Sequence, residues 1–339
     1  MASVHMPMSY ASLPTEVPML YHEGASLNCQ RVRLSLAEKG IQYRSRIIVI
    51  HDFEHLEPWF LKIQPLGTVP ALKHGPIRMI ETEAIILYLD QITTHAFTPK
   101  LQPDLATKEG QKSAYYQKLL KAVNVELIVT GSGCFRNLTA NCQLPSFANE
   151  TFLKNNIEEE VEKMKRLSNK HPDLRYEYLN MSELTQARLQ ALNEPEVIDA
   201  LEQCNKTLND VESELAKREQ EYNSNPSGEK PWLCGQNFTI ADIYLSTLLH
   251  RMVLAGQKER LWGNGYRPLI ASYYERVRRR TTFQESCMWA NEVYSSVILP
   301  MMTYKARKSA PYVIGFAAAA IGITIGAMIY YKGFPSLKR

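Results

Sequence analysis

The chain has 339 residues, of which 45% are hydrophobic and 22% are charged, so it contains enough apolar material for globular domains. The length indicates two domains with an additional segment. The formal net charge of +4 is too small to indicate a nucleic-acid-binding protein. The six cysteines are scattered and form no CxxC pair, which excludes a disulfide framework and a zinc site and favours free thiols in a reducing compartment.

Residues 1–18 contain no Lys or Arg and no continuous apolar run. They therefore lack the features of a signal peptide or a mitochondrial presequence, and we expect a disordered lead. The domain that follows, residues 19–95, has the predicted element order βαβαββα. The expected strands cover residues 19–22, 47–50, 71–73 and 78–80, and the expected helices include one ending at Lys39-Gly40, a short one from Pro58 and a last one over residues 82–91.

Two motifs in this domain are candidates for ligand binding. Pro70 follows Val69 in a short loop before an apolar strand, where a cis peptide bond would turn the backbone and present the N–H and C=O of the preceding residue outward. Such an edge can bind a peptide as an added strand. Glu81 and Thr82 precede a helical pattern, so they place a hydroxyl and free N–H groups at a helix N-terminus, which favours an anion.

Together the loop, the Val-Pro pair, the strand, the Glu-Thr pair and the helix resemble the thioredoxin-like half of a glutathione transferase. The resemblance implies the glutathione transferase fold, in which an α/β thioredoxin-like N-terminal domain precedes an all-α C-terminal domain. It implies further that Val69 and Pro70 hold the cysteinyl part of glutathione and that Glu81 and Thr82 hold its γ-glutamyl end. Glutathione is thus a possible ligand, and the sequence indicates no metal and no required cofactor.

Ser26 and Cys29 are the candidates for chemistry on the glutathione thiol. Aligning Arg31-Val32-Arg33 with the transferase family's Ser-Ser-Cys-x-x-Arg-Val-Arg segment puts Ser26 at the position of the working serine. Near a helix N-terminus this hydroxyl could hold a thiolate by a charge-assisted hydrogen bond. Cys29, in the first turn, could have a lowered pKa and react itself. The alternative interpretations are a helix-capping serine and a small buried thiol.

Residues 105–300 are predicted to form the all-α domain. Apolar residues recur at helical spacing from Tyr115 to Leu127, and again in a long amphipathic helix from Val197 to about residue 222. Between them, about residues 140–195 form an insertion. Its charged stretch over residues 151–171 predicts an exposed helix that Pro172 ends, and residues 173–195 show little pattern. The insertion is interpreted as a mobile partner-binding arm or as a tolerated surface insertion.

A folding motif of the transferase second domain follows the insertion. Thr239 and Asp242 form a capping-box-like pair ahead of an apolar helix, and Phe238 can pack on Ile243 as a hydrophobic staple. We therefore assign Thr239 and Asp242 to stability and not to chemistry.

Several segments also resemble the ganglioside-induced differentiation-associated protein 1 family. They are Glu57-Pro58-Trp59-Phe60, residues 232–250, Trp262-Gly263-Asn264-Gly265 and Tyr273-Tyr274-Glu275-Arg276-Val277. The resemblance implies a transferase-like protein of the mitochondrial outer membrane, facing the cytosol, that acts in mitochondrial and peroxisomal fission. It also implies a homodimer, a location that extends to peroxisomal membranes, and cytosolic fission or cytoskeletal partners bound through the insertion.

The C-terminal residues 312–331 contain no charged side chain. At 1.5 Å per residue, about 20 helical residues span about 30 Å, the thickness of one bilayer core. Tyrosines lie at both ends of this segment, where interfacial aromatics are common, and basic residues flank it on both sides. We expect a transmembrane tail anchor that leaves residues 1 to about 310 in the cytosol.

These features leave three functions open. The first is a tail-anchored protein that organises its membrane through partner contacts, recruiting or regulating other proteins because the sequence has no phosphate-binding loop. The second is a membrane-tethered glutathione S-transferase that conjugates or reduces small electrophiles. Its retained Val69-Pro70 and Glu81-Thr82 pairs favour this function, whereas Gln64, in place of the family's Asn, counts against it. The third is a non-catalytic sensor of glutathione or a lipid.

Overall fold

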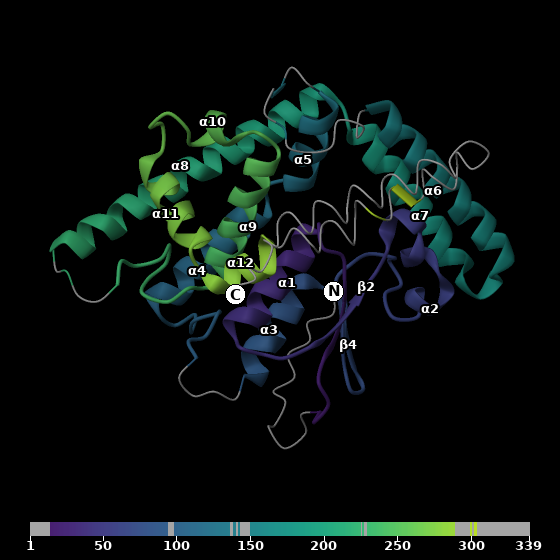
Figure 1. Ribbon diagram of the computed structural model, residues 1–339, viewed down its shortest axis with the longest axis horizontal. Helices are drawn as coiled ribbons and strands as arrows, with labels where there is room; N and C mark the ends of the chain where they lie inside the picture. The colour runs from purple at the N-terminus through teal and green to yellow at the C-terminus, as the bar shows by residue number, and fades with distance from the viewer. Residues whose placement is uncertain are drawn as a thin grey trace, which may run out of the picture.

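The computed structural model describes residues 14–93, 98–135, 138–139, 142, 150–224, 226, 229–288, 299 and 302–303. In these residues the chain forms an α/β domain followed by an all-helical domain (Figure 1). Most of the predicted lead and the whole apolar segment 312–331 lie outside the described residues. No helix among the described residues is long and apolar enough to span a bilayer.

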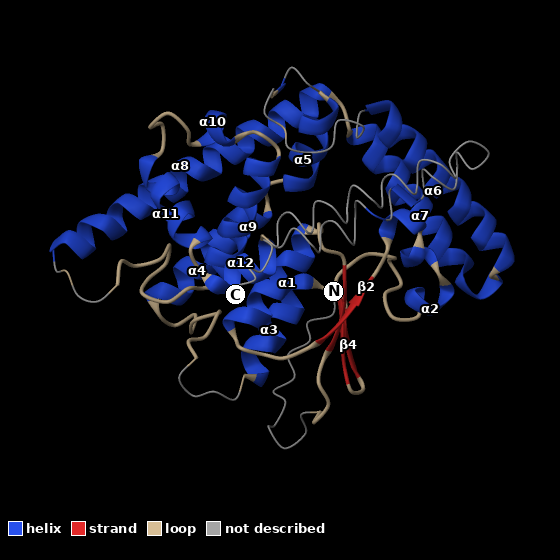
Figure 2. Ribbon diagram, viewed as in Figure 1, coloured by secondary structure: helices blue, strands red, loops and turns tan. Residues whose placement is uncertain are grey.

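The first domain is built on a four-stranded sheet (Figure 2). Its strands are β1 (Met19–His22), β2 (Arg44–Ile47), β3 (Ala71–His74) and β4 (Ile77–Met79), in the spatial order β2-β1-β3-β4. β1 pairs parallel with β2 and antiparallel with β3, and β3 pairs antiparallel with β4. Leu20 of β1 pairs with Leu72 of β3, and both are buried at the centre of the sheet.

The predicted position of the second strand was wrong by three residues, because β2 covers Arg44–Ile47 and not residues 47–50. β2 is an edge strand, and its Arg44, Ser45 and Arg46 side chains are exposed. Charged residues are common on sheet edges, where they discourage pairing with another chain. The β-branched run instead follows the strand: Ile48 is fully buried and its N–H donates to the His22 carbonyl at 2.8 Å.

Helices α1 (Leu27–Glu38), α2 (Pro58–Leu61) and α3 (Thr82–Ile92) complete this domain, which confirms the predicted order βαβαββα. The 3-10 helices Ile50–Asp52 and Glu54–Leu56 precede α2. α1 is buried along most of its length, because α3 packs on one side of it and two helices of the second domain pack on the others. The two domains therefore share one continuous apolar core.

The second domain consists of α-helices, as predicted. They are α4 (Lys108–Lys121), α5 (Val125–Cys134), α8 (Glu194–Ser224), α9 (Ile240–Leu254), α10 (Lys258–Leu261), α11 (Pro268–Arg278) and α12 (Thr281–Cys287). α9 is the central helix: it contacts α1, α4, α5 and α11, and nearly all of its side chains are buried. The predicted capping box of Thr239 and Asp242 is present at its start.

The insertion is a helical hairpin, α6 (Glu150–Lys170) and α7 (Arg175–Ala191), joined by the 3-10 helix Pro172–Leu174. It lies beside α2 (Figure 1) and packs on the first domain. A second apolar cluster joins the two parts and consists of Leu56, Leu61, Met164, Leu174, Tyr178 and Met181. The interpretation as a mobile arm was therefore wrong for the described residues, since both helices are docked through a shared core.

Polar contacts also hold the hairpin against the first domain. The Tyr178 hydroxyl donates to the Leu56 carbonyl at 2.8 Å, and the ring nitrogen Nε2 of His55 lies 2.9 Å from the Glu160 carboxylate. Gly67, at φ +59°, lies so close to α7 that a Cβ atom there would be 2.6 Å from the Met181 sulfur. The hairpin thus touches the loop that leads to Val69.

Candidate functional site

The predicted ligand-binding segments leave the sheet at one end. The C-terminal end of β1 pairs with the N-terminal end of β3, which in turn pairs with the C-terminal end of β4. The turn after β1, the loop before β3 and the segment after β4 therefore emerge together. These segments carry Ser26, then Val69 and Pro70, and then Glu81 and Thr82.

Two helix N-termini face this end of the sheet. α1 begins at Leu27, directly after the first segment, and α3 begins at Thr82, within the last one. The first N–H groups of a helix have no partners within the helix and carry a partial positive charge. Because both helix N-termini lie there, this end of the sheet can bind anions such as the carboxylates and the thiolate of glutathione.

Ser26 is the N-cap residue of α1 and is half-buried. Its Oγ accepts a hydrogen bond from the Cys29 N–H at 3.4 Å, which confirms the helix-capping interpretation. Capping uses the oxygen as an acceptor and leaves the hydroxyl proton available for donation. Ser26 is therefore able to cap the helix and to donate to an anion at the same time.

Cys29 lies in the first turn of α1, but its thiol is fully buried and accepts from the Glu23 N–H at 3.5 Å. Burial raises the pKa of the Cys29 thiol to about 12. The expectation of a lowered pKa was therefore wrong, because desolvation outweighs the helix N-terminus. The geometry favours the alternative, a small buried thiol, and leaves Ser26, which is only half-buried, as the accessible candidate.

The Val69–Pro70 peptide bond is cis, as predicted. Within the described residues, the N–H and C=O of Val69 make no hydrogen bond, so this backbone edge is available to a ligand. Buried Gln64 holds the loop ahead of it: its Nε2 donates to the Thr68 hydroxyl at 3.0 Å and its Oε1 accepts from the Leu66 N–H at 3.0 Å. Gln64 thus orders this loop although it departs from the transferase pattern.

Glu81 and Thr82 lie at the start of α3, where Glu81 is the N-cap and its side chain makes no capping hydrogen bond. Glu81 is exposed and Thr82 is half-buried. Within the described residues, neither side chain makes a hydrogen bond. Both remain available to the γ-glutamyl end of glutathione.

Sequence reasoning missed the charged residues beneath this site. Glu23, Arg33 and Arg251 are all buried directly behind the turn that carries Ser26. The Arg33 guanidinium donates to the Gly24 carbonyl at 3.1 Å and to the Ser286 carbonyl of α12 at 2.8 Å. Arg251 comes from α9, and no local pattern connects it to α1. The only signal in the sequence is a basic residue within the mainly apolar pattern of α9.

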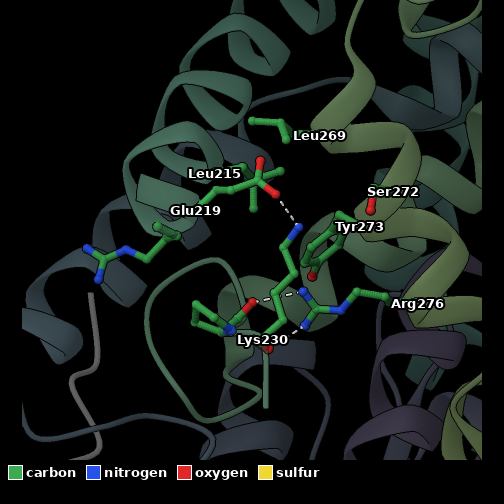
Figure 3. A pocket seen from close by; sticks show the side chains of 9 residues that line it. Leu215, Glu219, Lys230, Leu269, Ser272, Tyr273 and Arg276 are labelled. Atoms are coloured by element: carbon green, nitrogen blue, oxygen red, sulfur yellow. Dashed lines mark hydrogen bonds and ion pairs between the residues drawn. The ribbon is translucent and has the colours of Figure 1, made fainter. Parts of the chain in front are cut away.

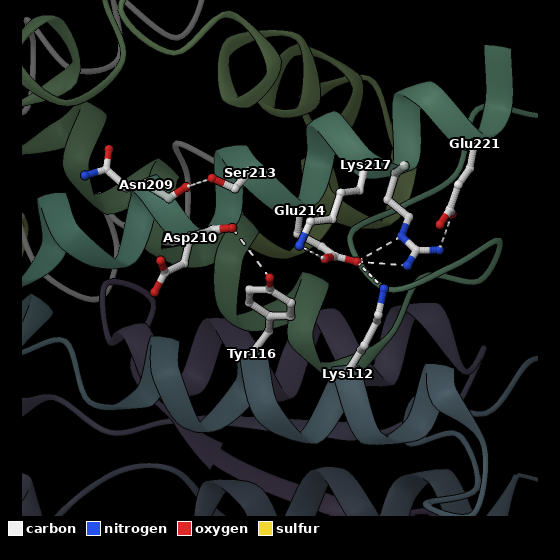
Figure 4. Close-up of polar contacts among 9 residues, drawn as sticks. Lys112, Tyr116, Asn209, Asp210, Ser213, Glu214, Lys217 and Glu221 are labelled. Atoms are coloured by element: carbon white, nitrogen blue, oxygen red, sulfur yellow. Dashed lines mark hydrogen bonds and ion pairs between the residues drawn. The ribbon is translucent and has the colours of Figure 1, made fainter. Parts of the chain in front are cut away.

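Two polar clusters far from this edge have structural explanations. The pocket in Figure 3 lies between the end of α8, the Lys230-Pro231 segment and α11, and the Lys230–Glu219 ion pair of 2.5 Å spans it. In Figure 4, Glu214 of α8 accepts from Lys112 of α4 at 2.5 Å and from Arg218 at 2.8 Å. Burial opposes the charge of Glu214, but these two hydrogen bonds outweigh it and lower its pKa.

Comparison with known proteins agrees with this architecture. Residues 20–95 match the family model of the glutathione S-transferase N-terminal domain, and residues 184–276 match that of the C-terminal domain. α4, α5, α6 and about half of α7 lie between the two matches.

Solved structures show the same fold. Glutathione transferase F7 from Populus trichocarpa is 17% identical, with a TM-score of 0.52 over 80% of this chain and 98% of its own. Ure2p in complex with glutathione is also 17% identical, with a TM-score of 0.55 over 80% of this chain and 99% of its own.

A curated relative extends the similarity over almost the full length. Ganglioside-induced differentiation-associated protein 1-like 1 of Homo sapiens is 28% identical over 326 residues, which cover 95% of this chain and 87% of the relative. This similarity therefore extends beyond the residues that the two domain models match. The chain belongs to the glutathione-transferase-like family of ganglioside-induced differentiation-associated protein 1.

Proposed function

We propose that this protein is a glutathione-binding, tail-anchored protein of the mitochondrial outer membrane that acts in mitochondrial and peroxisomal fission through protein partners. The observation that carries the glutathione part is the convergence of three groups at one end of the sheet. They are Ser26, the Val69 backbone, which makes no hydrogen bond within the described residues, and the Glu81-Thr82 helix start. Each group matches one part of glutathione: the thiolate, the cysteinyl backbone and the γ-glutamyl carboxylate. The solved relative Ure2p holds glutathione on the same fold.

The glutathione proposal is tested by replacing Ser26 with alanine in the full chain. Because a hydrogen bond to a charged group contributes about 1.5–3 kcal/mol, we expect glutathione affinity to fall at least about tenfold. Calorimetry measures this affinity, and a conjugation assay on the same sample decides between an enzyme and a sensor. The matched control is Ser213→Ala on the exposed face of α8, which should leave affinity unchanged.

S-methylglutathione separates the role of the hydroxyl from a general effect on the loop, because it has no ionisable thiol. Its affinity should change little in Ser26→Ala. Equal loss of both ligands would mean that the substitution distorts the α1 cap, and would contradict the thiolate contact. No binding of millimolar glutathione to the unsubstituted chain would refute the glutathione part of the proposal.

The membrane part of the proposal is supported by sequence and by family. The uncharged segment 312–331 has the length of a membrane span, and the family resemblance points to the mitochondrial outer membrane. The docked hairpin offers a partner surface on α7, where Tyr176 is 78% exposed and Leu184 is 50% exposed. We propose that cytosolic fission or cytoskeletal proteins bind there and that the protein is a homodimer.

Ending the chain after residue 305 tests the anchor. We expect the shortened protein to appear in the cytosolic fraction, because the removed segment carries the uncharged residues 312–331. Fractionation and microscopy of tagged chains measure this, and replacing Leu184 with aspartate provides a variant that should stay on the membrane. Retention of the shortened chain on mitochondria would show that another part of the protein holds it there.

A further inference from the structure

Two buried arginines hold the backbone immediately ahead of Ser26. Arg33 of α1 donates to the Glu23 carbonyl at 3.5 Å and to the Gly24 carbonyl at 3.1 Å. Arg251 of α9 donates to the Ala25 carbonyl. The three carbonyls that precede Ser26 therefore all point to buried guanidinium groups. The conformation of this turn depends on a residue of the second domain as well as on its own helix.

The positive charge of Arg251 lies beside this turn without a close carboxylate partner among the described residues. It is 7% exposed, and its Nη2 also donates to the Gln30 side chain at 2.9 Å. Its Nε has no hydrogen-bond partner, and no carboxylate lies within ion-pair distance of it among the described residues. A guanidinium is charged at all physiological pH values, so Arg251 places a buried positive charge beneath the Ser26 turn.

The titratable and charged neighbours of Arg251 come from the loop after β1 and from helices α1, α9 and α12, and they leave this charge largely uncompensated. They are Glu23 after β1, Cys29, Arg31 and Arg33 on α1, His250 on α9, and Cys287 on α12. Burial raises the pKa of the Glu23 carboxyl, and it raises that of the Cys29 thiol to about 12. Burial lowers the pKa of His250 to about 4, which leaves it neutral at physiological pH. The net local charge is positive because three guanidinium groups, those of Arg31, Arg33 and Arg251, lie near one carboxyl.

We propose that Arg251 is a positioning residue of the glutathione site, which fixes the Ser26 turn and promotes ionisation of the bound thiol. This inference rests on the proposed glutathione site. The thiol of bound glutathione releases its proton to water, and the resulting thiolate accepts the hydrogen bond from the Ser26 hydroxyl. A buried positive charge favours the thiolate over the thiol, because it is screened less than a charge in water.

Ultraviolet difference absorbance of the glutathione thiolate, titrated against pH in the full chain, tests this role. In Arg251→Met we expect the pKa of the bound thiol to rise by about one unit, which leaves about tenfold less thiolate near neutral pH. Arg251→Lys keeps the charge but loses the planar guanidinium group and its several donors, so it should give a smaller rise in the pKa of the bound thiol. S-methylglutathione should bind Arg251→Met nearly as well as the unsubstituted chain.

Arg31→Met is the matched control. Arg31 is a buried arginine of α1 whose guanidinium lies 4.0 Å from the Tyr244 ring centre and donates to the Thr247 hydroxyl. It makes no hydrogen bond to the turn that precedes Ser26 within the described residues. Its loss should affect stability and leave the pKa of the bound thiol unchanged.

The possible results distinguish the two proposals. If the unsubstituted chain binds no glutathione, the proposed function fails and this inference fails with it. If the chain binds glutathione and Arg251→Met leaves the pKa of the bound thiol unchanged, only the role of Arg251 is refuted. Loss of S-methylglutathione binding in both Arg251 variants would assign Arg251 a purely structural role and would refute its effect on ionisation. If Arg251→Met does not fold, Arg251→Gln, which removes the charge but keeps hydrogen-bonding atoms, takes its place, and an unchanged pKa of the bound thiol there refutes the inference.

Discussion

Replacing Asp242 with alanine should lower the free energy of unfolding by about 4 kcal/mol. The carboxylate is fully buried and accepts four hydrogen bonds: from the N–H and the hydroxyl of Thr239, both at 2.8 Å, from the Leu233 N–H at 3.0 Å, and from the Tyr273 hydroxyl at 2.8 Å. Alanine would leave these donors unsatisfied inside the core. Denaturant unfolding followed by circular dichroism measures the change.

This effect is larger than that of a capping residue alone, which is about 1 kcal/mol. Asp242 joins three segments: the start of α9, the turn at Leu233 and the ring of Tyr273 on α11. Asp199→Ala, on the exposed face of α8, is the control and should cost at most about 0.5 kcal/mol. A loss below about 1 kcal/mol in Asp242→Ala would show that water replaces the carboxylate at this site.

Replacing Tyr178 with alanine should detach the hairpin from the first domain and cost about 3–4 kcal/mol. Tyr178 is fully buried in the second apolar cluster, and its hydroxyl donates a hydrogen bond to the Leu56 carbonyl. Hydrogen exchange should accelerate both in α7 and in residues 53–67, because both sides supply residues to the shared core. Thermal unfolding and exchange mass spectrometry on the same sample provide the measurements.

The chain offers a matched control for this experiment two residues away. Tyr176 lies on the same helix but is 78% exposed, so Tyr176→Ala should leave stability and exchange unchanged. Tyr178→Phe removes only the hydroxyl and should cost about 1 kcal/mol. Faster exchange in α7 with no change in residues 53–67 would contradict mutual support between the hairpin and the first domain.

Local signals in the sequence were sufficient to predict most of the fold. The patterns of β1, β3 and β4, the Val69-Pro70 pair and the capping box all depend on residues close together in the chain, and the structure confirms their placement to within one residue. β2 was misplaced because β-branched residues indicate burial, and burial here falls just after the edge strand. α7 was missed because its packing face is completed by Leu56 and Leu61, which lie far away in the sequence.

In the candidate site, too, some residues were predicted from the sequence and others depend on contacts between distant segments. Ser26 was predicted from the family segment aligned on Arg31-Val32-Arg33, and the Glu81-Thr82 pair from the helical pattern that follows it. Sheet register then explains why the two segments emerge together. The buried environment of Cys29 and the reach of Arg251 into the Ser26 turn depend on packing between domains. Contacts of this kind connect residues more than 200 positions apart and leave no periodic pattern in the sequence.

The shared core of the hairpin and the first domain also sets an order of events during synthesis. The Tyr178 hydroxyl meets a carbonyl 122 residues earlier in the chain, so Leu56 and Leu61 leave the ribosome long before the helices that cover them. Until α7 emerges, the nascent first domain presents a bare apolar surface beside its completed sheet. Transiently exposed surface of this kind promotes aggregation and recruits chaperones. The covering of this surface therefore waits for the translation of the middle of the protein.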